Sequence, residues 1–176
     1  MNKETERLRI RTFQEKDLEE MHAIFVQPEI MRLVGMAPAH VSKEQSRERL
    51  ERWIRYGMHH AIVLKETENV IGYLLIKPGE KEREKELGCA LHPHYQRKGY
   101  MTETFQAVLK ELSKEGIQLV WACCFKENTA SRRLIEGCGF QFQKEGSYTT
   151  EEGVACTSLE YAIRLGKEVS HQEKEK

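Results

Sequence analysis

The sequence predicts a single α/β domain with a mixed, mostly antiparallel sheet flanked by helices. Segments of alternating polar and apolar residues are interspersed with segments whose apolar residues recur at helical spacing. Two predicted strands are joined by a short polar turn, as in a β-hairpin. Residues 86–125 follow the order strand–helix–strand, which is long enough for a right-handed parallel crossover. At 176 residues the chain has the size of one domain, with a predicted core over about residues 6–164 and a polar tail over 165–176.

Seven segments are predicted as strands. Residues 60–65 and 70–76 form the hairpin, and the charged residues 77–85 after it are expected to be a solvated loop. Residues 117–125 are a nearly continuous apolar run, which predicts a strand covered on both faces. The last two strands are joined through residues 146–153. The complete set is 7–13, 60–65, 70–76, 86–91, 117–125, 140–144 and 154–164.

Two helices are predicted in the N-terminal part. Thr12 and Glu15 have the spacing of a helix capping box, and Ser42 is expected to open the second helix. Between the two helices, Pro28 and residues 35–40 interrupt the helical pattern. The apolar faces are formed by Leu18, Met21, Ile24 and Phe25, and by Leu50, Trp53 and Ile54.

Two further helices are predicted after residue 99. One starts near Tyr100 and is stopped by Gly116, and the other spans residues 129–137 with Asn128 as its N-cap. The apolar face of the longer helix consists of Phe105, Val108, Leu109 and Leu112.

Composition excludes several classes of function. Lys plus Arg and Asp plus Glu each number 28, so no net field favours nucleic acid or an anionic membrane as a partner. The sequence has no apolar run of the roughly 20 residues that a membrane span requires. Residues 1–11 are polar and charged, unlike a signal peptide. We therefore expect a cytoplasmic protein.

Cysteine and histidine spacing does not favour a metal site or a disulfide framework. The five cysteines are an odd number with no CxxC pair. Cys89, His92 and His94 are close in sequence, but no second ligand pair at comparable spacing accompanies them, and Pro93 suggests a strand that exits into a loop. We expect neither a metal nor a disulfide.

The loop at residues 96–99 has the features of an anion site. It follows a predicted strand and leads into an amphipathic helix, whose N-terminal N–H groups and dipole favour a negative charge. Gly99 permits a close approach of the backbone to a ligand, and Arg97 and Lys98 add positive charge. These features favour a phosphate-bearing ligand, whereas the simpler alternative is a basic surface loop before an ordinary helix. GxxxxGK[ST] and GxGxxG are both absent, which disfavours a P-loop nucleotidase and a Rossmann dinucleotide fold.

The same segment resembles a known family. ELGCALHPHYQRKGYMTET, residues 86–104, is similar to the acetyl-CoA signature Q/R-x-x-G-x-G/A of the GCN5-related N-acetyltransferase (GNAT) superfamily. It is most similar to the branch of ribosomal-protein N-terminal acetyltransferases, which reads E-I-G-Y-x-L-x-P-x-x-x-G-K-G-Y-x-T-E-A. A second signature, N-x-x-S before a K-x-G-F-like element, is matched by Asn128, Ser131, Gly139 and Phe140. The resemblance implies a GNAT-like fold with splayed central strands that hold the cofactor, acetyl-CoA.

The resemblance also implies which residues contact acetyl-CoA. The backbone of Leu91 would pair with the pantetheine amides where the strands splay, and Asn128 and Ser131 would contact the cofactor. Asn128 can also be a helix cap. Met101 stands where the broad motif has a small residue, so its side chain must turn away if its backbone binds. Gln96 would also contact the cofactor. The residues whose amides would hold the pyrophosphate are Arg97, Lys98, Gly99, Tyr100, Met101 and Thr102.

Acetyl transfer needs removal of a proton from the amine, stabilisation of an oxyanion and a proton for the departing thiolate. Glu86 is the candidate base, although it also fits a simple strand-end charge. By analogy Ser131 would protonate the thiolate, although a serine in a first helical turn often bonds only to the backbone. Tyr148 is a weaker donor candidate because the sequence gives no register for it. The N–H near Leu91 could polarise the thioester carbonyl.

The expected function is direct acetyl transfer from acetyl-CoA to a primary amine in a ternary complex. The acceptor would be a protein N-terminus, a polyamine or another small amine, in a pocket near residues 34–40 and 147–153, on a monomer or homodimer. An alternative is a non-catalytic acyl-CoA-binding or sensor module on the same fold. A nucleic-acid binder is disfavoured by the balanced charge.

Overall fold

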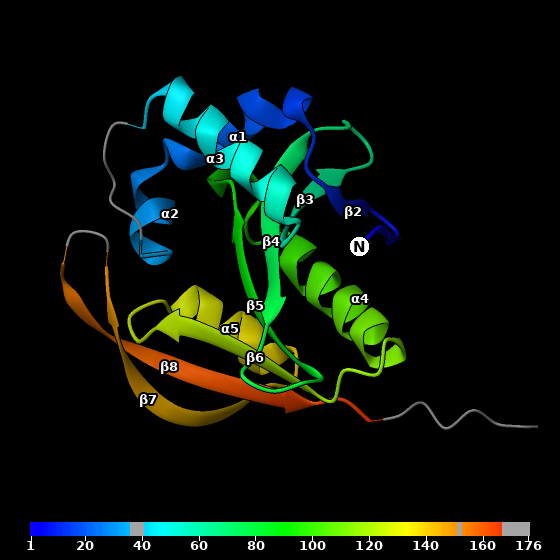
Figure 1. The fold of residues 1–176 in the computed structure, drawn as a ribbon, viewed down its shortest axis with the longest axis vertical. Helices are drawn as coiled ribbons and strands as arrows, with labels where there is room; N and C mark the ends of the chain where they lie inside the picture. Colours follow the sequence, from blue (N-terminus) through cyan, green and yellow to red (C-terminus); the bar gives the residue numbers. More distant parts are fainter. Residues whose placement is uncertain (36–40, 151–152, 167–176) are drawn as a thin grey trace, which may run out of the picture.

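A computed structural model describes residues 1–35, 41–150 and 153–166 (Figure 1). Its central element is an eight-stranded sheet in the order β1-β2-β3-β4-β5-β6-β8-β7. Every neighbouring pair is antiparallel except β5 and β6, which are parallel and joined through a helix. The predicted mixed, mostly antiparallel sheet and its single parallel crossover are thus confirmed. The strands are β1 Lys3–Glu4, β2 Leu8–Thr12, β3 His59–Leu64, β4 Val70–Pro78, β5 Glu84–Leu91, β6 Leu119–Phe125, β7 Gln141–Thr149 and β8 Ala155–Arg164.

The helices cover the two faces of the sheet unequally. One core cluster lies under α4 (Tyr100–Lys114) and α5 (Thr129–Gly137) and extends across the sheet from β2 to β8. The other joins α1 (Leu18–Phe25), α2 (Pro28–Leu33) and α3 (Lys43–Tyr56) to β3 and β4. Along β5 and β6, residues facing α4 and α5 are therefore in the core. On the opposite face, Ala90 still packs against the cluster under α1–α3, whereas Glu86 is half-buried and Cys123 is exposed.

The N-terminal helices differ from the prediction in two details. Ser42 caps α3 as expected, through a hydrogen bond from the Gln45 amide. The predicted capping box at Thr12 and Glu15 is wrong. Instead, the Gln14 amide donates to the Asp17 carboxylate at 2.8 Å and opens a short 3-10 helix, η1 (Glu15–Asp17), before α1. The Arg11 guanidinium donates two hydrogen bonds, of 2.7 and 2.8 Å, to the Asp17 carboxylate and holds it in place. The capping-box spacing does not predict this contact.

Pro28 was predicted only to interrupt a helix, whereas it starts a new one. Proline is favoured at the first helical position because its φ is already helical and no N–H partner is needed there. The resulting α2 buries Ile30 and Met31 in the cluster beneath α1 and α3. Residues 36–40, the rest of the predicted interruption, lie outside the described residues.

β7 is longer than predicted, whereas β8 matches its predicted strand to within one residue. β7 continues to Thr149 through Gly146, which was expected in the turn. Glycine fits there because a Cβ would lie 2.7 Å from the Glu160 carboxylate and 2.8 Å from the Ser158 hydroxyl on β8. β6 was expected to be covered on both faces, but Cys123 is exposed. The predicted loop 77–85 is also shorter, since β4 ends at Pro78 and β5 begins at Glu84.

The described part of the chain begins at residue 1 and ends at residue 166. Residues 167–176 of the predicted polar tail lie outside the described part of the chain. Among the helices that are described, none combines the length and apolar composition needed to cross a membrane.

His60 on β3 gives the fold a pH dependence. It is only 4% exposed, and burial, aided by the Met1 ammonium, lowers its pKa from 6.5 to about 4. Between pH 6.5 and 4, the imidazole of His60 binds a proton more readily in the unfolded chain than in the folded chain. The unfolding free energy is therefore highest above pH 6.5 and decreases as the pH falls towards 4. When the pH is lowered from 7 to 4.5, the unfolding free energy of His60→Leu should therefore decrease by about 2 kcal/mol less than that of the unaltered chain, as measured by urea unfolding. An equally steep loss in both proteins would contradict this, and exposed His94→Leu is the control.

Candidate active site

The parallel strands β5 and β6 separate partway along their length. Their pairing ends at Leu87 and Ala122, yet β5 continues to Leu91 and β6 to Phe125. Figure 1 shows β5 and β6 running apart. The splayed central strands implied by the family resemblance are therefore present, and the gap between them opens at Cys89 and Leu91.

The backbone of β5 presents hydrogen-bonding groups to this gap. The His92 N–H donates to the Ile71 carbonyl of β4 at 2.9 Å, and β5 is antiparallel to β4. Since successive residues of a strand point their N–H and C=O groups to alternate sides, those of Cys89 and Leu91 point away from β4, towards the gap. The Leu91 carbonyl accepts a hydrogen bond from the Gln96 side-chain amide at 3.1 Å. The N–H of Leu91 and both the N–H and the C=O of Cys89 thus point into the gap, where they can bind a ligand between the strands.

The loop after β5 contains two residues in the left-handed conformation, Arg97 at φ 61° and Gly99 at φ 79°. Gly99 is the N-cap of α4, and because it has no side chain, the first-turn N–H groups receive no cap from it. The Arg97 and Lys98 side chains are exposed, and the Lys98 ammonium lies 5.6 Å from the Tyr95 ring. Loop amides and the helix dipole therefore converge where an anion is expected.

Met101 buries its side chain in the core beneath α4, with 8% exposed. It therefore turns away from the loop, as required if its amide is to contact a ligand. Thr102 follows in the same first turn. The large side chain of Met101 is thus accommodated in the core, and the backbone at the start of α4 remains helical.

Asn128 and Ser131 lie together at the start of α5. The Asn128 side chain accepts the Ser131 amide hydrogen bond at 3.0 Å, so the predicted N-cap is confirmed. The Ser131 hydroxyl is within hydrogen-bonding reach of the Cys124 thiol, on the part of β6 beyond its pairing with β5. Burial raises the pKa of Cys124 to about 11. Ser131 is therefore beside the gap, on the α4–α5 face of the sheet. The Cys124 neighbour was not predicted from sequence.

Glu86 lies on β5 just before the strands separate, opposite Trp121 of β6. Strand alternation places it on the face opposite Leu87, and its carboxylate forms an ion pair with Lys77 at 3.0 Å. It is half-buried and close enough to Cys123 to help raise the pKa of that thiol, after the larger effect of burial. Glu86 thus lies on the α1–α3 face of the sheet, outside the core cluster under those helices.

Tyr148 is brought from β7 to the end of β6. Its ring packs against Phe125 at 5.4 Å between centroids, and a Cβ on Gly35 would lie 2.5 Å from it. Phe125 and Cys124 point to opposite faces of β6, so Tyr148 and Ser131 lie on opposite sides of that strand. The described parts of the two predicted acceptor segments, around 34–35 and 147–150, therefore meet at Tyr148. Residues 36–40 and 151–152 lie outside the described residues.

The candidate metal ligands do not converge. Cys89 packs against the core under α4, whereas His92 follows β5 and its Nε2 lies 3.4 Å from the side-chain nitrogen of Gln27, the N-cap of α2. Within the described ranges, no group of three or more His, Cys, Asp or Glu side chains is placed to hold a metal ion.

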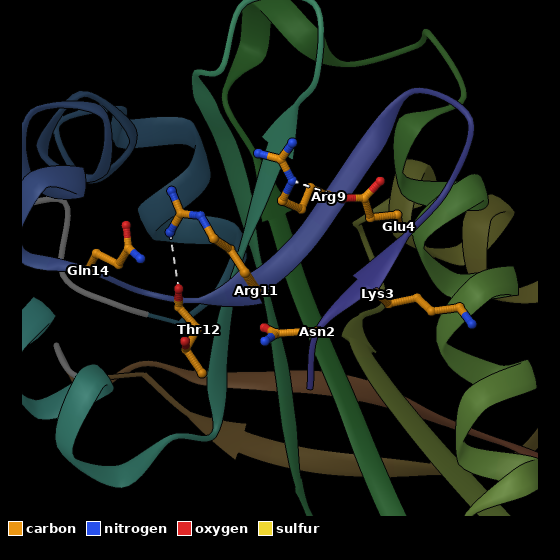
Figure 2. A pocket seen from close by; sticks show the side chains of 7 residues that line it. All are labelled: Asn2, Lys3, Glu4, Arg9, Arg11, Thr12 and Gln14. Carbon is orange, nitrogen blue, oxygen red and sulfur yellow. Dashed lines mark hydrogen bonds and ion pairs between the residues drawn. The ribbon is translucent and has the colours of Figure 1, made fainter.

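Figure 2 shows a hollow at the outer edge of the sheet, away from the splayed strands. Its arginines already have carboxylate partners, since Arg9 pairs with Glu4 and Glu68, and Arg11 pairs with Asp17. None of the predicted site residues lines it. The lining residues are Asn2, Lys3, Glu4, Arg9, Arg11, Thr12 and Gln14.

Several proteins similar to this chain in sequence or fold are acetyltransferases. The uncharacterized N-acetyltransferase YoaA of Bacillus subtilis (strain 168) is 28% identical over 170 residues, covering 91% of this chain and 94% of the relative. The crystal structure of a GNAT-family acetyltransferase from Bacillus anthracis has a TM-score of 0.86 at 26% identity, covering 94% and 99% of the two chains.

More distant structures share the fold. Spermidine N-acetyltransferase from Vibrio cholerae, solved with CoA and spermine, has a TM-score of 0.78 at 18% identity, covering 93% of this chain and 98% of that one. Structures of the ribosomal-protein acetyltransferase type have it as well.

The sequence model of the family described as "Acetyltransferase (GNAT) domain" matches residues 7–141. This match includes the splayed part of β5, the loop at Gln96–Gly99 and the Asn128–Ser131 cap. The chain therefore belongs to the GNAT acetyltransferase family and is an acetyltransferase.

Proposed function

We propose that this chain transfers the acetyl group of acetyl-CoA to a primary amine by direct attack in a ternary complex. The observation that carries the proposal is the gap between β5 and β6, which leads from the Leu91 N–H to the N-terminus of α4. A pantetheine arm offers amides for the backbone of Cys89 and Leu91, and a pyrophosphate suits the N–H groups after Gly99. When bound, acetyl-CoA supplies the thioester that the amine attacks.

The residues around the gap have separable roles. The Leu91 N–H is directed to polarise an acyl oxygen in the gap. The Ser131 hydroxyl, held at the start of α5 by the Asn128 cap, is beside the gap to return a proton to a thiolate. On the opposite face, Glu86 is available to accept the amine proton, directly or through water. Tyr148, on that same face, fits the wall of the acceptor pocket better than a role at the sulfur.

Direct attack is favoured over a cysteine-bound acetyl intermediate because the nearby thiols are poor nucleophiles. Burial raises the pKa of Cys89 to about 12 and that of Cys124 to about 11. Since the thiolate is the reactive form, both groups are protonated and unreactive at neutral pH.

The central test is an acetyl-transfer assay. The unaltered chain is incubated with acetyl-CoA and separate primary amines, namely spermidine and peptides with unblocked N-terminal Ala or Ser, and products are identified by mass spectrometry. Spermine bound to a relative of the same fold is the reason to include polyamines. A mass increase of one acetyl group on an amine supports the proposal. Saturable CoA binding with no acetylated amine favours the non-catalytic acyl-CoA-binding module instead.

Ser131→Ala should lower kcat by roughly a hundredfold with little change in the KM for acetyl-CoA, because a positioned proton donor acts mainly in the transition state. Steady-state kinetics with a saturating amine measure this. Cys124→Ala is the matched control, since it removes the thiol that Ser131 contacts and should keep kcat within about threefold if no acetyl-cysteine forms. Loss of activity in Cys124→Ala, with Ser131→Ala active, would contradict these roles.

A further inference from the structure

We propose that Arg7 is a positioning residue for the cofactor loop, in that it sets the orientation of the Lys98–Gly99 peptide and compensates the charge of Glu103. This inference rests on the proposed function, because it assumes that the loop amides bind the CoA phosphates. Arg7 precedes β2, is 91 residues before Lys98, and belongs to no motif of the loop itself.

The Arg7 guanidinium contacts the loop at three points. Its Nη1 donates to the Lys98 carbonyl at 3.0 Å, and its plane lies over the Tyr100 ring at 4.5 Å from the centroid. Its Nε and Nη2 each lie 2.7 Å from Oε2 of Glu103, in the first turn of α4. The fork of the guanidinium thus joins the loop carbonyl, the first helical residue and the helix carboxylate, an arrangement that a single ammonium could not reproduce.

The carbonyl contact determines where the Gly99 N–H points. In a trans peptide the C=O and N–H groups point in opposite directions. Because Arg7 binds the Lys98 carbonyl, the Gly99 N–H is directed to the side away from Arg7. A charged donor on the carbonyl also polarises the peptide, which makes its N–H a better donor to an anion.

The loop needs such an external anchor. Arg97 adopts a left-handed φ of 61°, a conformation that is unfavourable for a residue with a side chain. Gln96 holds the entry of the loop through the Leu91 carbonyl, and Arg7 holds its exit through the Lys98 carbonyl. With both ends fixed, the intervening amides are oriented before a ligand arrives, so less ordering is required on binding.

Glu103 gives Arg7 its second role. A carboxylate in the first turn of a helix repels a phosphate bound at the same terminus. Burial tends to raise the pKa of Glu103, but hydrogen bonds from Thr5 and Arg7 outweigh this and lower it, so the carboxylate remains ionised. Its charge is balanced by the guanidinium and by donors from the Thr5 hydroxyl and the Arg7 amide. Loss of the Arg7 side chain would leave this negative charge beside the anion site.

The test compares CoA binding by Arg7→Ala, Arg7→Lys and Arg9→Ala using titration calorimetry. Arg9 is the matched control, since it is an arginine of the adjoining strand that pairs with Glu4 and Glu68 and does not contact the loop. We expect Arg7→Ala to weaken CoA binding about tenfold, and Arg7→Lys to recover only part of it because an ammonium lacks the fork. Arg9→Ala should remain within about twofold of the unaltered chain.

A second readout separates positioning from folding. With saturating acetyl-CoA, Arg7→Ala should recover most of the unaltered kcat while its KM for acetyl-CoA is raised, and its melting temperature should match that of Arg9→Ala. If Arg7→Ala does not fold, Arg7→Lys carries the comparison. CoA binding unchanged by either Arg7 substitution, or weakened equally by Arg9→Ala, would overturn the inference alone. No CoA binding by the unaltered chain would overturn the proposed function as well.

Discussion

Tyr100→Pro is expected to weaken acetyl-CoA binding about tenfold or more relative to Tyr100→Ala, although both variants should keep α4 intact. Tyr100 is the first residue of α4, where proline is well tolerated because its missing N–H has no partner within the helix. Both substitutions remove the aromatic ring that Arg7 covers, and only proline removes the amide. The difference between them therefore measures the loss of one N–H group directed at the phosphates, together with any change at Gly99, whose ψ of 0° a following proline disfavours.

Calorimetry with CoA, together with far-UV circular dichroism to check the helix, makes this comparison. Lys98→Ala is the companion variant, since it removes an exposed positive charge and leaves the backbone unchanged. We expect a smaller loss from Lys98→Ala than from proline. Equal losses from the two would show that side-chain charge, rather than amide geometry, forms the site. Proline at Gly99 is a less suitable test, because its φ of 79° is incompatible with proline.

Gly72→Ala should have the largest effect on stability, at about 3 kcal/mol. Gly72 lies opposite Leu91, next to an irregularity in the pairing of β3 and β4. A Cβ there would be 2.3 Å from the Ala90 carbonyl oxygen and 3.0 Å from the Leu91 Cα, which are backbone atoms and cannot simply rotate away. The strands must move apart at the residue whose N–H faces the gap. The KM for acetyl-CoA should therefore rise along with the loss of stability.

Gly88→Ala is the matched control on the neighbouring strand. Its Cβ would meet only the Leu75 side chain, no closer than 3.5 Å, an ordinary van der Waals distance. It should change the unfolding free energy by less than about 1 kcal/mol, since glycine in a strand interior is not otherwise favoured. Urea denaturation of both variants checks this pair. Similar destabilisation by the two would show that the close approach at Gly72 is not the cause.

The cofactor loop was predictable because its signals are local. Gly99, the basic pair before it and the amphipathic pattern after it predict a loop that leads into a helix, and the structure contains that loop, with Gly99 as the N-cap of α4. The Asn128 cap was predictable for the same reason, since the capping side chain and its partner amide are three residues apart. The capping box predicted at Thr12 and Glu15 was wrong because another nearby side chain caps the helix instead. Arg11 binds the carboxylate of Asp17, which accepts the hydrogen bond from the Gln14 amide.

The arrangement around the loop was not predictable in this way. The contact from Arg7 to Lys98 and that from Tyr148 to Phe125 and Gly35 join distant segments, and no periodic pattern encodes such pairs. From the sequence, Ser131 and Tyr148 were both candidates for the donor of a proton to the thiolate. The sheet separates them, since Cys124 and Phe125 alternate across β6.

The sequence by itself determined most of the elements and their order, and it predicts an anion site at residues 96–102, because caps, turns and periodicity depend on neighbours along the chain. It missed β1 and α2. Only the tertiary structure decided where β5 and β6 part, which backbone groups of Cys89 and Leu91 face the gap, and how Arg7 holds the loop. These features depend on which strands lie side by side and on side chains that meet across the sheet. The burial of apolar faces, rather than any local preference, selects that arrangement.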